Sequence, residues 1–93
     1  MSYKLKFKDE ALKEWHKLDA TVRAQFKKKL AERLEHPRVA AAHLAGHPDR
    51  FKIKLRSAGF RLVYEVRDAE IVVVVIAVGK RERNAVYQVA ARR

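Results

Sequence analysis

Apolar residues in the first half of the chain recur with the spacing of one strand and two helices. Residues 3–7 alternate between apolar side chains and lysines, which predicts a half-buried strand. From residue 11 to 18 and from 22 to 34, apolar residues return every three or four positions, as on one face of a helix. Asp9 is placed to cap the first helix, and Pro37 closes the second. The short link between them predicts an antiparallel helical hairpin.

In the second half of the chain the period changes to two. Residues 51–55 and 60–66 alternate between apolar and mostly charged side chains, which predicts two strands with one buried face each. The eight apolar residues of 71–78 predict a central strand covered on both faces, and they are far fewer than the ~20 needed to cross a membrane. Gly79 ends this strand, and Asn84 is a candidate cap for a short final helix.

The predicted order of elements defines an α+β domain with an N-terminal strand, a helical hairpin, an antiparallel β-meander and a short C-terminal helix. The 93 residues form a single domain, residues 1–93, with a loop over 38–49. The chain has no cysteine, and its N-terminus lacks the continuous apolar stretch of a signal peptide. These features predict a soluble protein of the reducing cytoplasm without membrane contacts.

Charge is the compositional feature that bears most on function. Twenty-two Lys and Arg against eleven Asp and Glu give a formal net charge of +11. Residues 1–49 carry eleven basic and seven acidic groups, whereas residues 50–93 carry eleven and four. Such a field attracts polyanions, and counterion release is the usual source of affinity for nucleic acid. An acidic protein partner would satisfy the same field, and in the first half the lysines are equally well explained as solubilising the surface.

The parity of the hairpin decides whether its cations share one face. A two-residue turn at Ala58-Gly59 places Ser57 opposite Phe60 and puts every large apolar side chain except Val63 on the core side. A slip of one residue would send those side chains to the basic face, which burial forbids. Such a turn does not favour Ala58, so a bulged loop of the same parity is the alternative. The predicted cross-strand pairs are Arg56 with Arg61, Lys54 with Val63, and Lys52 with Glu65.

One face of the predicted hairpin therefore carries Lys52, Lys54, Arg56 and Arg61, and Glu65 is the one acid among them. Like charges crowded in this way repel one another. An ordinary surface would intersperse acids among them, so the arrangement favours binding of a polyanion over simple solvation.

Other basic residues are candidates for contacts to RNA phosphates. Lys80 and Arg83 lie just beyond the predicted central strand. Lys27 and Lys28 lie off the apolar stripe of the second helix. A solvated surface is the simpler explanation for them, and a contact to RNA phosphate is the more specific one.

Cleavage of RNA by its own 2′-hydroxyl requires a base, charge stabilisation at the phosphate and a proton for the leaving 5′-oxygen. Histidine is the residue usually expected to act as acid and base in this reaction, but all four histidines precede the basic hairpin. His43 and His47 have metal-ligand spacing only if they lie on a helix, and Gly46 and Pro48 argue against one there. We therefore expect no metal site and no cofactor.

Lysine and arginine side chains offer an alternative set of catalytic groups. Lys52 and Lys54 lower each other's pKa by repulsion, so either is a candidate base, and the sequence does not say which. Arg61 presents a planar fork suited to phosphate, and Arg81 is a candidate for the leaving oxygen. Tyr87 is a candidate for stacking on a base or positioning the hydroxyl, with packing against the sheet as the alternative.

Three segments give the chain a family resemblance that runs nearly end to end. They are ALKEWHKL at residues 11–18, FKIKLRSAGFRLVYEV at 51–66 and VGKRERNAVY at 78–87. The last two together are specific, whereas isolated KxK or KRER strings are not. On these segments the sequence closely resembles the RelE family of bacterial toxin–antitoxin toxins.

This resemblance implies a ribosome-dependent endoribonuclease that enters the vacant A site and cleaves the messenger RNA there. It also implies a RelB-like antitoxin that wraps the sheet and helices, and an operon that the pair represses together. Contact with operator DNA is expected only through that complex. In such toxins the lysines lie near the attacking hydroxyl, Arg61 lies at the scissile phosphate, Arg81 lies near the leaving group and Tyr87 stacks on the substrate.

Two features depart from the family pattern. Family members often carry an arginine between the Leu and Gly at 44–46, where this chain has Ala45, and that position is thought to assist contact with RNA. The final helix is also short. Both departures predict reduced activity or weaker closure over the site, although neither touches the five candidate catalytic positions.

Three hypotheses remain open from the sequence. The leading one is an RNA-cleaving toxin that acts on ribosomes. The second is a catalytically weak or inactive module that binds nucleic acid or ribosomes and acts as a corepressor. The third is a structural partner for an acidic protein. Substitution of Lys54 or Arg81 by Gln separates the first two, because a nuclease would lose orders of magnitude in rate whereas a binder would lose only salt-sensitive affinity.

Overall fold

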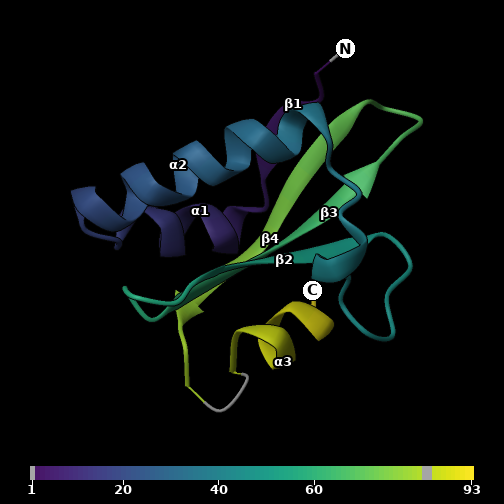
Figure 1. Cartoon of the computed structure of the whole chain (residues 1–93). Coiled ribbons are helices and arrows are strands. Elements are labelled where there is room, and N and C mark those ends of the chain that lie inside the picture. Colours follow the sequence, from purple (N-terminus) through teal and green to yellow (C-terminus); the bar gives the residue numbers. More distant parts are fainter. Residues whose placement is uncertain (1, 83–84) are drawn as a thin grey trace.

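The computed structural model describes residues 2–82 and 85–93. Two helices lie on one side of a four-stranded sheet and a short third helix lies on the other (Figure 1). The elements in chain order are β1 (Lys4–Phe7), α1 (Asp9–His16), α2 (Ala20–Glu35), a 3-10 turn η1 (Ala40–Ala42), β2 (Arg50–Leu55), β3 (Phe60–Arg67), β4 (Val72–Lys80) and α3 (Ala85–Ala91). The α+β prediction is confirmed, and η1 adds a turn to the expected loop.

The sheet combines an antiparallel meander with one parallel strand. Its order is β1-β4-β3-β2, so the apolar strand β4 is internal, as predicted. β2, β3 and β4 pair antiparallel, whereas β1 pairs parallel with β4. A parallel pair needs a crossover connection. The rest of the chain between β1 and β4 supplies that crossover, and alternation of apolar residues gave no information about it.

Alternation along β4 builds two cores. One face of the sheet buries Val73, Val75 and Val78 against residues of α1 and α2 such as Trp15 and Phe26. The other face buries a second group that includes α3, and its members are Leu44, Val63, Val72, Val74, Ile76, Ala77, Val86 and Ala90. This division explains why the strand is apolar at every position from 72 to 78.

The helical hairpin forms as predicted, with differences in detail. Asp19 rather than Asp9 provides a side-chain cap, since its carboxylate accepts from the Val22 amide at 2.9 Å. Asp9 is the first residue of α1, and Lys8 precedes it without a capping side chain. An acid in the first turn is still favoured there by the helix dipole. Leu5 and Leu12 fit the apolar pattern, yet both are exposed, because periodicity identifies a face but not what covers it.

The β2–β3 hairpin has the predicted parity but a different register. Lys54 pairs with Arg61 and Lys52 with Val63, two positions away from the predicted pairs. The loop therefore has four residues, 56–59, because β2 ends at Leu55 and β3 begins at Phe60. A shift of two leaves every side chain on its expected face. β4 also runs one residue beyond Gly79, to Lys80.

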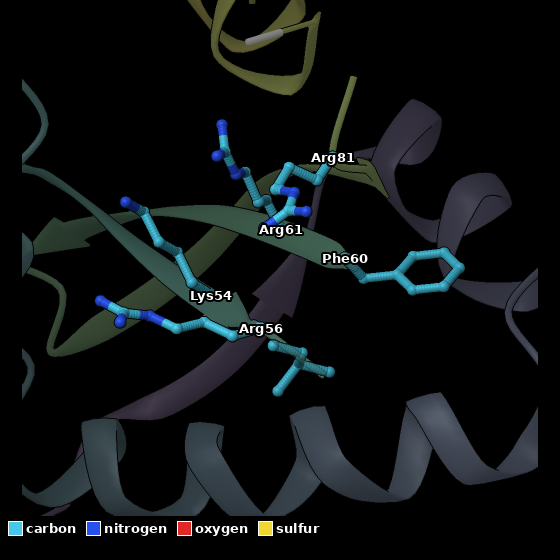
Figure 2. A pocket seen from close by; sticks show the side chains of 6 residues that line it. Lys54, Arg56, Phe60, Arg61 and Arg81 are labelled. Carbon is cyan, nitrogen blue, oxygen red and sulfur yellow. The ribbon is translucent and has the colours of Figure 1, made fainter. Parts of the chain in front are cut away.

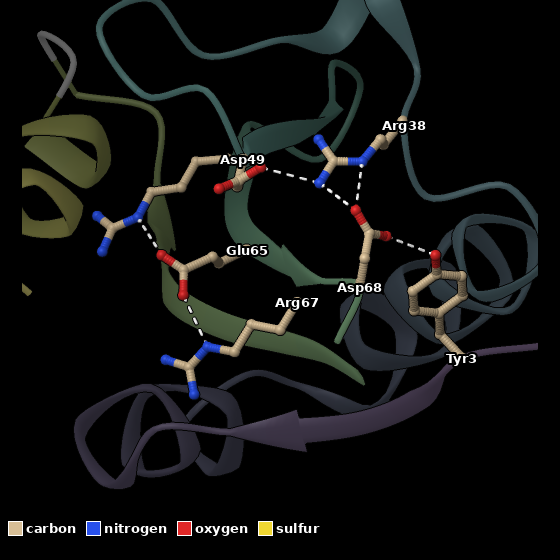
Figure 3. A network of polar contacts seen from close by, with 7 residues as sticks. Tyr3, Arg38, Asp49, Glu65, Arg67 and Asp68 are labelled. Carbon is tan, nitrogen blue, oxygen red and sulfur yellow. Dashed lines mark hydrogen bonds and ion pairs between the residues drawn. The ribbon is translucent and has the colours of Figure 1, made fainter. Parts of the chain in front are cut away.

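A polar network ties the loop ahead of β2 to the residue before β1 and the residue after β3, at one end of the sheet (Figure 3). Arg38 donates to Asp49 at 2.8 Å and to Asp68 at 2.6 Å, and the Tyr3 hydroxyl donates to Asp68 at 2.6 Å. The hydrogen bond from Tyr3 and, next in size, the one from Arg38 lower the pKa of Asp68.

Within the described residues, no helix is both long and apolar enough to span a bilayer.

Candidate active site

The hairpin brings two cations directly opposite one another. Lys54 on β2 and Arg61 on β3 are cross-strand partners, so both side chains project from the same face of the sheet. Lys52, two residues earlier on β2, projects from that face as well. This is the opposite face from the core that contains Ile53 and Leu62. The predicted convergence is therefore confirmed for Lys52, Lys54 and Arg61, whereas Arg56 lies in the loop after β2 and does not pair with Arg61.

Lys54 and Arg61 border a hollow at the loop end of the hairpin (Figure 2). Its volume is about 230 Å³, and it lies between the end of β4 and the β2–β3 loop. The residues that line it are Lys54, Leu55, Arg56, Phe60, Arg61 and Arg81. Four of these six are cations, and no acid lines the hollow, so it is suited to a phosphate group.

Arg81 is fixed at the hollow by the hairpin loop. Its backbone amide donates to the Gly59 carbonyl at 2.7 Å, and the Gly59 amide donates to the Leu55 carbonyl at 2.8 Å. Gly59 has φ 73°, a left-handed conformation that glycine adopts without a steric penalty. The loop thus orients a carbonyl toward the residue after β4, which brings Arg81 and Arg61 to one place although they are twenty positions apart.

Tyr87 covers the cations from α3. The Arg61 guanidinium carbon lies 5.1 Å from the centre of the Tyr87 ring, and the Lys52 ammonium lies 5.7 Å from it. Both are cation–π distances. The Tyr87 hydroxyl oxygen is buried and has no hydrogen-bond partner among the described residues. Because buried polar groups without a partner are rare in folded proteins, this hydroxyl beside two cations marks Tyr87 as a candidate functional residue.

Gly79 allows α3 to approach the sheet closely. It pairs with Arg61 across the sheet, and a Cβ atom at this position would lie 3.2 Å from the Val86 side chain. That is tighter than ordinary van der Waals contact. The absence of a side chain at residue 79 therefore determines how near Val86, and Tyr87 after it, come to β4.

The electrostatics of the site favour a neutral lysine. Lys54 is surrounded by cations, and its pKa is lowered by the Lys52 charge first, then by desolvation and by Arg61, Arg56 and Arg81. A lysine with a lowered pKa releases its proton more readily and is a better base near neutral pH. Burial acts on Tyr87 in the opposite sense and raises its pKa, with Arg61 opposing the shift.

A second hollow adjoins the first and contains Arg33, which the sequence places off the apolar stripe of the second helix but not among the candidate site residues. The hollow is lined by Lys52, Lys54, Arg56, three residues near η1 and Arg33. Arg33 donates to the Lys52 carbonyl at 3.3 Å and to the Tyr64 hydroxyl at 2.8 Å. Its position off the apolar stripe was the available signal, because a long side chain there can reach the neighbouring strand.

Three of the remaining predicted RNA contacts, Lys27, Lys28 and Lys80, lie away from the hollow. Lys27 and Lys28 are exposed on α2, which packs on the opposite face of the sheet from α3 (Figure 1). Lys80 pairs with Phe60, so the register directs it to the face opposite Arg61. Arg83 and the proposed cap Asn84 lie outside the described residues.

Among residues 2–82 and 85–93, no group of three or more His, Cys, Asp or Glu side chains is placed to hold a metal ion.

Fold and site together define a small α+β protein with a cationic, tyrosine-covered face suited to a phosphodiester. Comparisons with known proteins agree with this class. A family model described as "ParE toxin of type II toxin-antitoxin system, parDE" matches residues 5–85. The chain is 60% identical over 93 residues to the mRNA interferase toxin RelE of Escherichia coli strain K12, covering 100% of this chain and 98% of that protein.

Solved structures show the same relationship. A variant of the E. coli toxin RelE in the free state matches with a TM-score of 0.92 at 58% identity, covering 100% of this chain and 98% of that one. The toxin in the intact E. coli RelBE toxin–antitoxin complex matches with a TM-score of 0.85 at 61% identity, covering 88% and 100%. The chain therefore belongs to the RelE family of toxins of type II toxin–antitoxin systems.

Proposed function

We propose that this toxin is a cytoplasmic endoribonuclease that binds the small ribosomal subunit and cleaves messenger RNA in the A site. The observation that carries the proposal is the opposed pair Lys54 and Arg61, with Arg81 beside it and Tyr87 above it. The relatives named mRNA interferases support the reaction class. The arrangement supplies fixed charge and a candidate base without calling on histidine.

The proposed reaction is an in-line displacement at phosphorus. Lys54 or Lys52 accepts the proton of the 2′-hydroxyl, and the 2′-oxygen forms a bond to the phosphorus atom. Arg61 stabilises the charge on the phosphoryl oxygens. The bond to the 5′-oxygen breaks, and that leaving oxygen takes up a proton from the nearby Arg81 guanidinium or from water. The products are a 2′,3′-cyclic phosphate and a 5′-hydroxyl, and Tyr87 holds the substrate nucleotide in place.

Purified toxin added to programmed ribosomes tests this function. We expect new message 5′ ends that map to the A-site codon, while the same message without ribosomes remains intact. Lys54→Gln or Arg81→Gln should slow cleavage by about two to four orders of magnitude, with a much smaller loss of ribosome affinity. Intact message in both reactions would contradict the proposal and favour a binding module without catalysis.

We further propose that a RelB-like antitoxin neutralises this toxin and that the two repress their operon together. The solved complexes of relatives with RelB support the partner. The basic surface alone is expected to bind DNA without sequence preference, because phosphate contacts carry no sequence information. Mobility-shift assays on operator and scrambled DNA should show selective binding only when toxin and antitoxin are mixed. Selective binding by the toxin alone would contradict this division of roles.

A further inference from the structure

The helix that carries Tyr87 is too short to hold its own position. α3 spans Ala85–Ala91, seven residues, and isolated helices shorter than about 12 residues are marginal in water. Its apolar contribution to the second core rests mainly on two residues, Val86 and Ala90. The placement of Tyr87 over the cations must therefore depend on further contacts that hold α3 to the sheet.

The first such contact comes from β2. Arg50 donates from Nη1 to the Ala90 carbonyl at 2.6 Å, which satisfies one of the unpaired carbonyls at the end of α3. Its Nε donates to Glu65 Oε1 at 3.1 Å, and Arg67 donates to the other Glu65 oxygen at 2.8 Å (Figure 3). The Arg50 side chain is only 12% exposed, so this bond is largely shielded from solvent.

The second contact comes from α1, which packs against β4. Arg93 follows α3, and its guanidinium donates to both carboxylate oxygens of Glu14, at 2.8 and 3.2 Å. The same Arg93 Nη1 also lies 2.9 Å from the Ile76 carbonyl, and Glu14 Oε1 accepts from the Val78 amide at 3.2 Å. A two-pronged arginine–carboxylate pair is among the stronger side-chain interactions.

The sheet explains why this pair forms where it does. The pairing of β1 with β4 ends at Phe7 and Val75. Beyond that point the Ile76 carbonyl and Val78 amide, on the outer edge of β4, are met by Arg93 and Glu14 instead of a strand. One pair of side chains thus satisfies a strand edge and fastens the end of α3 to it.

We propose that Glu14, Arg93 and Arg50 are positioning residues that hold α3 against the sheet and thereby keep Tyr87 over Lys52 and Arg61. None of the three lines the cationic hollow. Their effect on cleavage is therefore indirect and passes through Tyr87. The expected effect on the cleavage rate rests on the proposed nuclease function, whereas the expected effect on the position of Tyr87 does not.

Glu14→Gln and Arg93→Gln provide the kinetic test. Each removes the charge pair while keeping a side chain of similar size. Because misplacement of a substrate-positioning group by about 1 Å can cost up to about 100-fold in rate, we expect single-turnover cleavage on programmed ribosomes to fall about tenfold or more. Ribosome affinity should change less than about twofold. Glu10→Gln and Arg92→Gln, at exposed neighbouring positions, are the matched controls and should leave the rate unchanged.

A double-mutant cycle separates positioning from a general loss of structure. If Glu14 acts through Tyr87, then Glu14→Gln should add less than about twofold to the defect of Tyr87→Ala. Urea midpoints of all variants establish that each is folded under assay conditions, and Arg93→Gln replaces Glu14→Gln if the latter is not. An equally large loss with and without Tyr87 would overturn the proposal, as would an unchanged rate in both single variants.

A measurement on the protein alone keeps this proposal distinct from the proposed function. Burial raises the pKa of Tyr87, so loosening α3 should bring that pKa back toward the usual value of about 10. Titration of the Tyr87 ring resonance by NMR in Glu14→Gln and Arg93→Gln should show this decrease, with Tyr64 as the internal reference. An unchanged Tyr87 pKa in both variants would overturn the proposal whether or not the wild-type protein cuts RNA.

Discussion

At the scale of single residues, the proposed chemistry depends on how cations are crowded around Lys54. Its strand neighbour Lys52 has the largest effect in lowering its pKa, and Arg61 across the hairpin adds to the effect. A lysine is normally a poor base at neutral pH because nearly all of it is protonated. Repulsion shifts that balance toward the neutral amine, so in the proposed reaction the cations around Lys54 would both attract the phosphate and make this lysine a better base.

Lys52→Gln tests the electrostatic role of this neighbour. Removing the charge should raise the pKa of Lys54 toward its usual value. If neutral Lys54 is the base, then the rising limb of the pH–rate profile moves to higher pH and the rate at neutral pH falls. Single-turnover cleavage measured across pH on programmed ribosomes shows the shift, with Lys6→Gln on β1 as the control. A loss that is equal at every pH would instead make Lys52 the base.

Tyr64 has a structural role, and a variant at this position tests how much its hydrogen bonds stabilise the fold around the site. The side chain is fully buried, its hydroxyl donates to the Pro37 carbonyl at 2.7 Å, and it accepts from Arg33 at 2.8 Å. Tyr64→Phe removes both hydrogen bonds and leaves the Pro37 carbonyl without this donor, so we expect a loss of about 1–3 kcal/mol in the free energy of unfolding. Urea denaturation measures it. Tyr3→Phe, whose hydroxyl bonds an exposed carboxylate, should cost less than about 1 kcal/mol.

At the scale of elements, the β2–β3 loop determines the shape of the hollow. The loop returns the chain so that Lys54 faces Arg61, and its last residue, Gly59, accepts from the backbone of Arg81. Three cations from three strands or strand ends are therefore fixed by backbone hydrogen bonds before any substrate arrives. Such preorganisation is what makes charge stabilisation effective in a transition state.

Gly59→Ala tests the role of this loop. Alanine at φ 73° is strained by about 1 kcal/mol, and the loop can relieve that strain by rotating the carbonyl away from Arg81. We expect slightly lower stability and faster hydrogen exchange at the Arg81 amide, measured by NMR. Gly46→Ala is the control, because Gly46 has a similar φ of 84° and makes no bond to Arg81. Equal exchange rates at Arg81 in the two variants would contradict this role.

At the scale of the whole molecule, the two faces of the sheet have separate tasks. The face covered by α1 and α2 holds the core that includes Trp15, Phe26 and Tyr64. The other face carries the cations and the short helix α3 (Figure 1). The net charge of +11 extends beyond the hollow, so in the proposed function it would contribute to encounter with the ribosome as well as to contact at the phosphate.

Lys27 and Lys28 separate these two effects of charge. They lie on α2, away from the hollow, so Lys27→Gln with Lys28→Gln should leave the cleavage rate of bound toxin unchanged. If each lysine contacts a phosphate, then the slope of log affinity against log salt becomes shallower by about 0.7 per lysine. This slope is measured from ribosome binding at salt concentrations between roughly 50 and 200 mM, the range over which such phosphate contacts weaken. An unchanged slope would make this surface a solvated one.

Much of the fold was predictable because the local spacing of apolar residues indicates which segments form helices and which form strands. The period of two in residues 51–55 and 60–66 and the period of helices before them depend only on backbone geometry, and both were confirmed. Parity follows from the same alternation, so the sequence alone placed Lys52, Lys54 and Arg61 on one face of the hairpin. Burial of the apolar partners leaves no other choice of face.

Only the tertiary structure decided the contacts between distant segments. Register depends on the conformation of loop 56–59, and a shift of two residues keeps every face unchanged, so no apolar pattern distinguishes Lys54–Arg61 from Lys54–Val63. The exposure of Leu12 and the bond between Glu14 and Arg93 arise from which elements come to lie together. Alternation along a chain fixes directions of side chains, whereas their partners are chosen by packing in three dimensions.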